Sequence, residues 1–347
     1  MVETNIKKPL FMSNLWQLVP GIFFVFVLAL VANWLGNKYA LIGGAVFGII
    51  IGILINNTVG KPSLTVKGVA FTGKKILQLA IIVLGAGLSL TQVWHTGLSS
   101  LYVMVFTLST AFLAAFGFGK LMRIPLKLTT LIGVGTAICG GSAIAAVSPI
   151  VEAEDMEIAY AISTIFLFNV IAVLIFPPLG HLMGFSSKAF GLWAGTAIND
   201  TSSVVAAGYA YSNTAGAYAT IVKLTRTTMI IPVSLVLTAI MARHNKIKFQ
   251  AEEAAVNFSI VKIFPWFILW FLVASLMNTL GLFSKAMLPD INTVGKFLII
   301  MALTAIGLGS NFKQLAKTGI KPLLLGLIVW FVVAAVSIAV QFSMGQI

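Results

Sequence analysis

Residues 158–179 read IAYAISTIFLFNVIAVLIFPPL, 22 consecutive residues without a charged side chain. A helix that crosses the hydrocarbon core of a bilayer needs roughly 20 mostly apolar residues, so this stretch predicts a membrane-spanning helix. The whole 347-residue chain has the same character, because 59% of it is hydrophobic and only 9% is charged. A soluble domain carries about 25% charged residues. The bilayer is therefore the predicted solvent for most of this chain.

Ten further apolar runs of similar length lie between polar breaks. The sequence therefore predicts an all-α, polytopic transmembrane protein with about eleven spans and no soluble domain. The whole of 1–347 is one predicted transmembrane domain, and its longest polar connection, 242–260, is a predicted cytoplasmic linker. The eleven predicted spans are 16–35, 40–57, 68–90, 98–119, 128–150, 158–179, 189–211, 214–241, 261–282, 293–312 and 320–342.

The loop charges predict the orientation. With the N-terminus inside, 14 of the 22 Lys and Arg residues fall in connections on the inner side. The outer connections carry only Lys38 and Lys285, with an acidic run at 152–157. This is the positive-inside pattern of a bacterial cytoplasmic membrane protein, here with a cytoplasmic N-terminus and an outer C-terminus. It also accounts for the net charge of +13 without a nucleic-acid partner.

Internal repetition points to a transporter. TAICGGS at 136–142 and TAIGLGS at 304–310 share five of seven residues and lie five predicted spans apart. This spacing favours inverted five-helix repeats with halves 40–180 and 189–342, to which the span 16–35 is an addition. Two rival pairings exist: GTAI recurs at Gly135 and Gly195, and Gly-Lys recurs at Gly73 and Gly295.

Both matched segments are rich in glycine inside a predicted span. Such segments survive in a membrane where they line a cavity or meet other protein, so each predicts a broken helix at a midplane substrate site. The alternative is that the small residues only permit close helix packing. The predicted substrate-binding residues here are Thr136, Cys139, Gly140, Gly141, Ser142, Gly307, Gly309, Ser310 and Asn311.

A polar run, Asn199 to Ser203, interrupts the span 189–211. These side chains are unfavourable in lipid unless they face a polar interior. Asp200 is the only acidic residue in the middle of a predicted span, so it is the candidate for binding H+ or Na+. The alternative is a structural hydrogen-bond network. The predicted coupling-ion residues are Asn199, Asp200, Thr201, Ser202 and Ser203.

Two cations lie in the span 214–241. Lys223 and Arg226 are three residues apart and therefore share one face of a helix. The planar fork of Arg and the point charge of Lys suit an oxyanion, so both are predicted to bind substrate. The alternative is that they reach the membrane interface by snorkelling.

Signatures of enzymes are not visible in the sequence. It contains no HExxH zinc motif and no phosphate-binding loop, and Cys139 is the single cysteine, with no histidine nearby in the sequence. We therefore predict no enzymatic activity, no cofactor and no metal site.

Four segments carry a family resemblance. GVGTAICGGSAIAAVSPIVEAE (133–154), GTAINDTSSVVAAGYAYS (195–212), VKLTRTTMIIP (222–232) and LIIMALTAIGLGSNFKQLAKTGIKPLL (298–324) resemble the YeiH-type family of bacterial membrane proteins, which is labelled a sulfate exporter family. The resemblance implies two inverted five-helix repeats with crossed broken helices. The family commonly has His where this chain has Asn199, which leaves proton coupling to Asp200 alone or favours Na+.

The sequence thus predicts a secondary active transporter that moves a small anion, such as sulfate, a sulfonate or a similar oxyanion, by alternating access. Its expected partners are the anion, a coupling H+ or Na+ and the lipid bilayer, and a homo-oligomer is compatible with the sequence. The alternatives are an ion-coupled importer of organic carboxylates and, from a different class, a passive channel or an intramembrane enzyme.

Overall fold

The computed structural model describes residues 16–39, 43–245, 265–310 and 318–347, and these residues form helices and no strands. The predicted all-α, polytopic class is confirmed. Seven helical segments are long and apolar enough to cross a membrane: Val19–Lys38, Ser63–Gly85, Leu90–Leu121, Asp155–Leu182, Asn213–Met241, Leu288–Gly309 and Ile320–Ser343. Two shorter apolar helices, Gly43–Thr58 and Trp266–Thr279, match further predicted spans.

The chain divides into two compact units, which are described one at a time. Unit 1 comprises Met1–Leu84 and Ser284–Phe312, and unit 2 comprises Gly85–Phe283 and Lys313–Ile347. This division does not follow the predicted repeat halves, so the five-helix inverted repeat stays a prediction. The predicted linker lies, from residue 246 on, outside the described residues.

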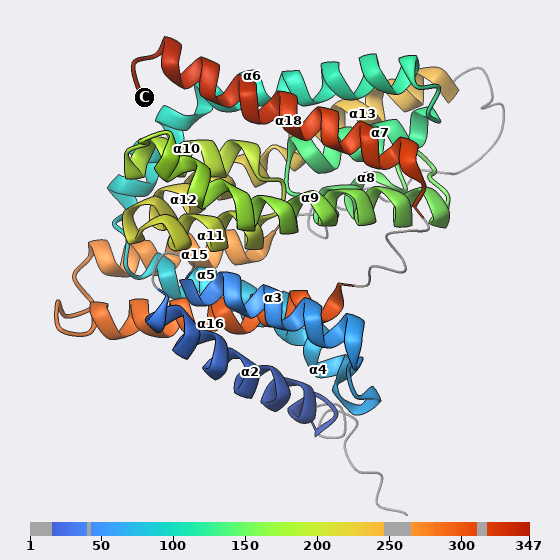
Figure 1. Ribbon diagram of the computed structural model, residues 1–347. Helices are drawn as coiled ribbons and strands as arrows, with labels where there is room; N and C mark the ends of the chain where they lie inside the picture. The colour runs from blue at the N-terminus through green and yellow to red at the C-terminus, as the bar shows by residue number, and fades with distance from the viewer. Residues whose placement is uncertain (1–15, 40–42, 246–264, 311–317) are drawn as a thin grey trace, which may run out of the picture. The chain divides into compact units, whose positions relative to one another are not determined.

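Unit 1 contains α2 (Val19–Lys38), α3 (Gly43–Thr58), α16 (Leu288–Gly309) and a segment made of η1 (Ser63–Thr65), α4 (Val66–Phe71), the π-helical η2 (Thr72–Ile76) and α5 (Leu77–Gly85) (Figure 1). Glycines bring its helices together. A Cβ added at Gly52 would lie 2.4 Å from the backbone oxygen of Thr304, and one added at Gly307 would lie 2.4 Å from that of Ile49. Small residues permit such close helix approach in membranes, where van der Waals packing stabilises helix pairs.

These contacts bear on one prediction. Residues 307–311 were expected to break a helix, and α16 ends within this range, at Gly309. Gly307 is buried against α3, so the alternative explanation, close packing, holds for this glycine. Ser310 ends the helix, and its backbone oxygen accepts hydrogen bonds from the side chains of Asn56 and Asn57 at 2.7 and 3.0 Å. Asn311 lies outside the described residues.

Two substitutions on α16 test this packing. We expect Gly307→Ala to lower the free energy of unfolding by about 1–3 kcal/mol, because the added methyl overpacks the contact with Ile49. Gly309→Ala is the matched control, since a Cβ there meets open space. We expect the control to stay within about 0.5 kcal/mol of the parent. Thermal unfolding of both purified variants measures the difference, and equal stability would contradict the packing.

Unit 2 combines long helices with two pairs of short ones. The long elements are α6 (Leu90–Leu121), α9 (Asp155–Leu182), α12 (Asn213–Thr228) followed by α13 (Ile230–Asn245), and α18 (Ile320–Ser343); α15 (Trp266–Thr279) is shorter. The short pairs are α7 (Leu126–Ala137) with α8 (Gly141–Val147), and α10 (Ser187–Ala197) with α11 (Thr201–Tyr211). Both pairs pack against α9. Helices α7 and α8 contact one part of α9, and α11 contacts another part.

Side-chain caps explain where several of these helices begin. The Ser89 side chain caps α6, Ser186 caps α10, and Glu154 and Glu157 form a capping box at α9. Each serine accepts a hydrogen bond from an otherwise unpaired N–H of the first helical turn, and Glu157 accepts one from the N–H of Glu154 at 3.0 Å. Ser212 both ends α11 and caps α12 through a bond from the Ala215 N–H. One residue therefore reverses the chain between these helices.

Candidate functional site

The first short pair is a helical hairpin. The Lys127 ammonium at the start of α7 donates to the backbone oxygen of Glu152, just after α8, at 2.6 Å. Deeper in the pair, a Cβ added at Gly135 of α7 would lie 2.9 Å from the Ile144 side chain of α8. The chain turns at 138–140, where Gly140 has φ +70° and ψ −129°, a conformation that favours glycine. The start of α7 and the segment after α8 therefore lie side by side at the base of the hairpin, and the turn 138–140 forms its tip.

The second short pair is also a hairpin. Ser187 at the start of α10 and Ser212 after α11 share a hydroxyl–hydroxyl bond of 2.8 Å, and the rings of Phe190 and Tyr211 stack at 3.9 Å. Its turn, 198–200, follows GTAI (195–198), just as the first turn follows GTAI (135–138). The two helix breaks therefore correspond to each other through the GTAI repeat, which begins at Gly135 and at Gly195. The repeat that the sequence favours, 136–142 with 304–310, does not relate these two breaks.

The hairpins correct the predicted spans 128–150 and 189–211. Each was expected to cross the membrane once, but each turns back to the end at which it started. A helix of the length of α7 or α10 rises about 18 Å, which is roughly half of a hydrocarbon core about 30 Å thick. The bases of the hairpins lie at opposite ends of α9 (Figure 1). That helix is much longer and rises about 42 Å, enough to cross the core.

The two turns meet at their tips. A Cβ added at Gly140 would lie 3.4 Å from the Cβ of Asp200, which is ordinary van der Waals contact. Asn169, on α9, joins the second tip to the bundle, because its side-chain oxygen accepts hydrogen bonds from the backbone N–H groups of Asn199 and Asp200 at 3.2 and 3.0 Å. Sequence reasoning missed Asn169. A lone amide within the apolar run 158–179 was the signal that could have found it.

Lys223 and Arg226, from α12, hold both tips. The Lys223 ammonium donates to the backbone oxygens of Ile138 and Ile198 at 2.7 and 3.0 Å. Arg226 donates from Nε to Ala137 at 2.5 Å, from Nη2 to Thr136 at 2.6 Å and from Nη1 to Thr196. These carbonyls close α7 and α10, where helix dipoles concentrate partial negative charge.

This arrangement excludes one of the two interpretations of the basic pair. Both side chains are 0% exposed, so they do not snorkel to an interface. Their described hydrogen bonds go to backbone carbonyls of the hairpins, and no described ion pair joins either of them to Asp200. The carbonyl ends of two helices accept the hydrogen bonds of both cations, and the predicted role of the pair in binding an oxyanion stays a prediction.

Asp200 and its neighbours begin α11. The Asp200 carboxylate caps this helix by accepting from the backbone N–H of Ser202 at 2.9 Å, and it also accepts from the Ser202 hydroxyl. Asp200 is partly exposed, whereas Thr201, Ser202 and Ser203 are buried. The predicted coupling run therefore lies at the second tip and builds a helix N-terminus there. Its role with a coupling ion stays a prediction.

Two buried polar side chains at the tips have no partner among the described residues. Neither the oxygen nor the nitrogen of the Asn199 amide makes a hydrogen bond, although this residue is only 1% exposed. The Thr136 hydroxyl is likewise buried and unpaired. An unpaired buried polar group is unfavourable by about 1–3 kcal/mol, so such groups call for a bound partner, either water or a ligand.

The other predicted substrate residues divide between the units. Cys139, Gly140, Gly141 and Ser142 form the first tip and the start of α8, where Cys139 is 3% exposed and Ser142 is exposed. Gly307, Gly309 and Ser310 belong to unit 1. Unit 2 alone therefore brings together Thr136, residues 139–142, residues 199–203, Lys223 and Arg226.

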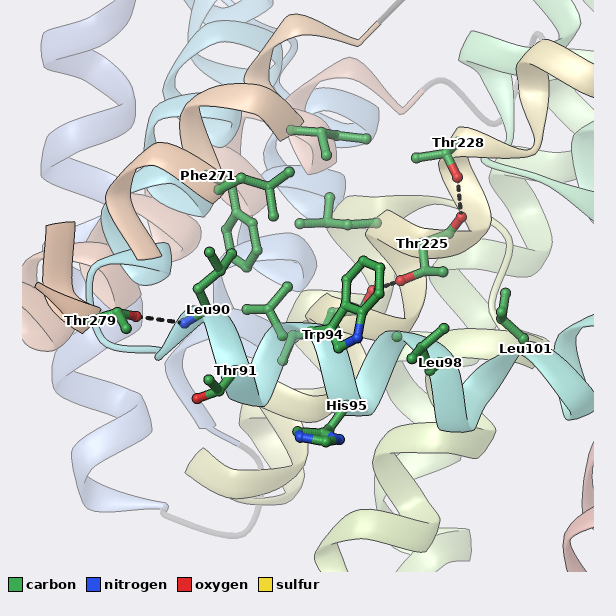
Figure 2. Close-up of a pocket in the computed structure, with 16 residues that line it drawn as sticks. Leu90, Thr91, Trp94, His95, Leu98, Leu101, Thr225, Thr228, Phe271 and Thr279 are labelled. Atoms are coloured by element: carbon green, nitrogen blue, oxygen red, sulfur yellow. Dashed lines mark hydrogen bonds between the residues drawn. The ribbon is translucent and has the colours of Figure 1, made fainter. Parts of the chain in front are cut away.

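A separate cavity of about 700 Å³ lies on the other side of α12, between this helix, the start of α6, and α15 (Figure 2). Leu224, Thr225 and Thr228 of α12 line it, together with Trp94 and His95 of α6. Its lining is largely apolar and contains no Lys or Arg, so it lacks the charges that would bind an oxyanion. The hairpin tips are the better candidate for an anion.

Comparison with known proteins identifies the family. The profile of the family described as "Conserved hypothetical protein 698" matches residues 20–326. A UPF0324 membrane protein of Clostridium tetani is 48% identical over 94% of this chain and 97% of its own length. Relatives with the same family name from Streptococcus pyogenes serotype M18 (46% identical; 96% and 99% covered) and Fusobacterium nucleatum (47%; 94% and 98%) are similar. No solved structure matches. The chain is thus a member of the UPF0324 family of membrane proteins.

Proposed function

We propose that this protein is a secondary active transporter that binds a small anion at the tips of its two helical hairpins. The observation that carries the proposal is the buried Asn199 amide, which has no partner among the described residues. Asn199 directly follows Ile198, whose backbone oxygen accepts a hydrogen bond from the buried Lys223. A bound ligand that both accepts and donates hydrogen bonds, directly or through water, would satisfy the Asn199 amide.

The charge at the tips favours an anion. Lys223 and Arg226 contribute two positive charges, and Asp200 contributes one negative charge. Net charge is strongly unfavourable in a low-dielectric interior, so an anion that enters this site is stabilised by the excess cation. Sulfate, sulfonates and similar oxyanions fit this requirement, and so do organic carboxylates.

The backbone supports transport rather than a purely structural role. Irregular backbone at membrane depth is tolerated where it is enclosed by protein or lines a polar cavity. Two helix breaks that meet near the middle of a helical bundle are the arrangement in which secondary transporters bind substrates and ions. In our proposal the protein lies in the bacterial cytoplasmic membrane with its N-terminus inside, and Asp200 to Ser203 serve the coupling ion.

Thermal-shift screening of the purified protein with inorganic and organic anions tests the proposal, because a ligand that binds only the folded state raises Tm. We expect one anion class to raise Tm in the parent and not in Asn199→Ala. Counterflow with the same anion in proteoliposomes then separates a transporter from a passive channel, which does not support counterflow. An identical Tm response in Asn199→Ala would contradict a site at the tips.

A pair of isosteric substitutions makes the test sharper. Thr136→Val replaces an unpaired hydroxyl with a methyl group, so we expect stability to stay equal or rise. Anion affinity should fall about tenfold, the equivalent of about 1.4 kcal/mol, if this hydroxyl contacts the anion. Thr220→Val is the control, because its hydroxyl already donates to the Gly216 oxygen on the same helix as Lys223. The ratio of the two affinities, measured by titration, decides the outcome, and equal affinities would remove Thr136 from the site.

A further inference from the structure

The C-terminal ends of α7 and α10 converge on one point in unit 2. The last carbonyls of a helix have no intrahelical partner and carry its partial negative charge. Here two such ends meet, and Lys223 receives one carbonyl from each, Ile138 at 2.7 Å and Ile198 at 3.0 Å. In broken-helix transporters, half-helix C-termini and unwound carbonyls of this kind coordinate a free cation such as Na+.

We infer that the Lys223 ammonium occupies a monovalent-cation site that the two hairpin turns form, and that it excludes Na+ from this site. The inference rests on the proposed function and adds one point to it. A coupling Na+ does not bind to the carbonyls that Lys223 occupies.

The geometry suits lysine for this role. An ammonium is a compact point charge, unlike the planar fork of Arg226, which lies one helical turn further along and satisfies a different set of carbonyls. The other charged or titratable groups near Lys223 are Asp200, whose carboxylate caps α11, and Cys139 at the first tip. Because the ammonium is 0% exposed, a free cation can bind to these carbonyls only by displacing it.

Removing the lysine should create a Na+ site. We expect Lys223→Ala to unfold at a lower temperature than the parent in choline chloride, and Na+ at the same chloride concentration to raise its Tm by about 3 °C or more through binding to the folded state. The parent and the control Lys188→Ala, an exposed lysine at the start of α10, should both respond to Na+ less than Lys223→Ala does, because Lys223 occupies the site in both. Because chloride is constant, this result is independent of any anion site.

Lys223→Ser provides a second, smaller neutral side chain whose hydroxyl can itself coordinate Na+. A Tm that does not respond to Na+ in either variant would overturn the inference, and so would a Na+ response of the parent equal to that of the variants. Failure of both variants to fold even in Na+ would also count against it, because the added ion should replace the lost charge. A different result would contradict the proposed function: no anion raises the Tm of the parent protein.

Discussion

Substitution of Arg226 by methionine is expected to lower the free energy of unfolding by about 3 kcal/mol or more. The change removes the shared partner of three buried carbonyls, at Thr136, Ala137 and Thr196. Each unpaired buried acceptor is unfavourable by about 1–3 kcal/mol. Arg226→Lys keeps the charge but not the three-pronged geometry, so its loss should be intermediate. Thermal unfolding of the purified variants measures the ranking.

Cys139 supplies an independent readout of the same change. It is the single cysteine of the chain, it is buried at the first tip, and a thiol reagent can reach it only if the tips open. We expect Arg226→Met to be labelled by a maleimide many times faster than the parent below the Tm of both. Lys120→Met, at an exposed position of α6, is the control. A labelling rate unchanged by Arg226→Met would show that the guanidinium does not hold the tips together.

The second large effect is an all-or-none labelling pattern. In a Cys139→Ala background, single cysteines are placed at the exposed positions Arg123, Asp155, Ser186 and Thr214, which flank the two hairpins. If α7–α8 and α10–α11 are hairpins, Arg123 and Asp155 label from one side of the membrane, and Ser186 and Thr214 label from the other. Accessibility to an impermeant thiol reagent in cells and in inverted vesicles measures this.

The eleven-span arrangement predicts a different pattern for these four cysteines. It puts Arg123 on the same side as Ser186, and it puts Asp155 with Thr214. If Arg123 labels with Ser186, and Asp155 labels with Thr214, the hairpins are refuted. A cysteine at the exposed Lys188 should report the same side as Ser186 and serves as the control for local accessibility.

The sequence could not separate these two topologies for a physical reason. Compared with the eleven-span arrangement, the two hairpins remove two membrane crossings. Only the connections before and after α9 therefore move to the opposite side of the membrane. Among loop cations this moves Lys188 alone, and a split of 14 against 2 becomes 13 against 3. The acidic run 152–157 moves too, but acidic residues contribute little to orientation. Each hairpin is also about as long as one span, so its hydropathy looks the same.

The residues at the tips were predictable because polar groups inside an apolar span must be accommodated. This reasoning identified Cys139 to Ser142, Asn199 to Ser203 and the pair on α12, all of which unit 2 brings to one place. At TAIGLGS the alternative explanation holds for Gly307, which packs α16 against α3, whereas Gly309 meets open space. Glycine serves both a helix break and a close helix contact, and one sequence cannot tell which.

One guanidinium bonded to two hairpins also restricts how the protein can move. Either hairpin could bend away at its turn only by breaking its bonds to Arg226 and to Lys223, which leaves buried charges and carbonyls unpaired. Separate opening of one turn like a gate is therefore the unfavourable route. Under the transport proposal, α7, α8, α10, α11 and α12 would therefore move as one rigid block that keeps the tips closed.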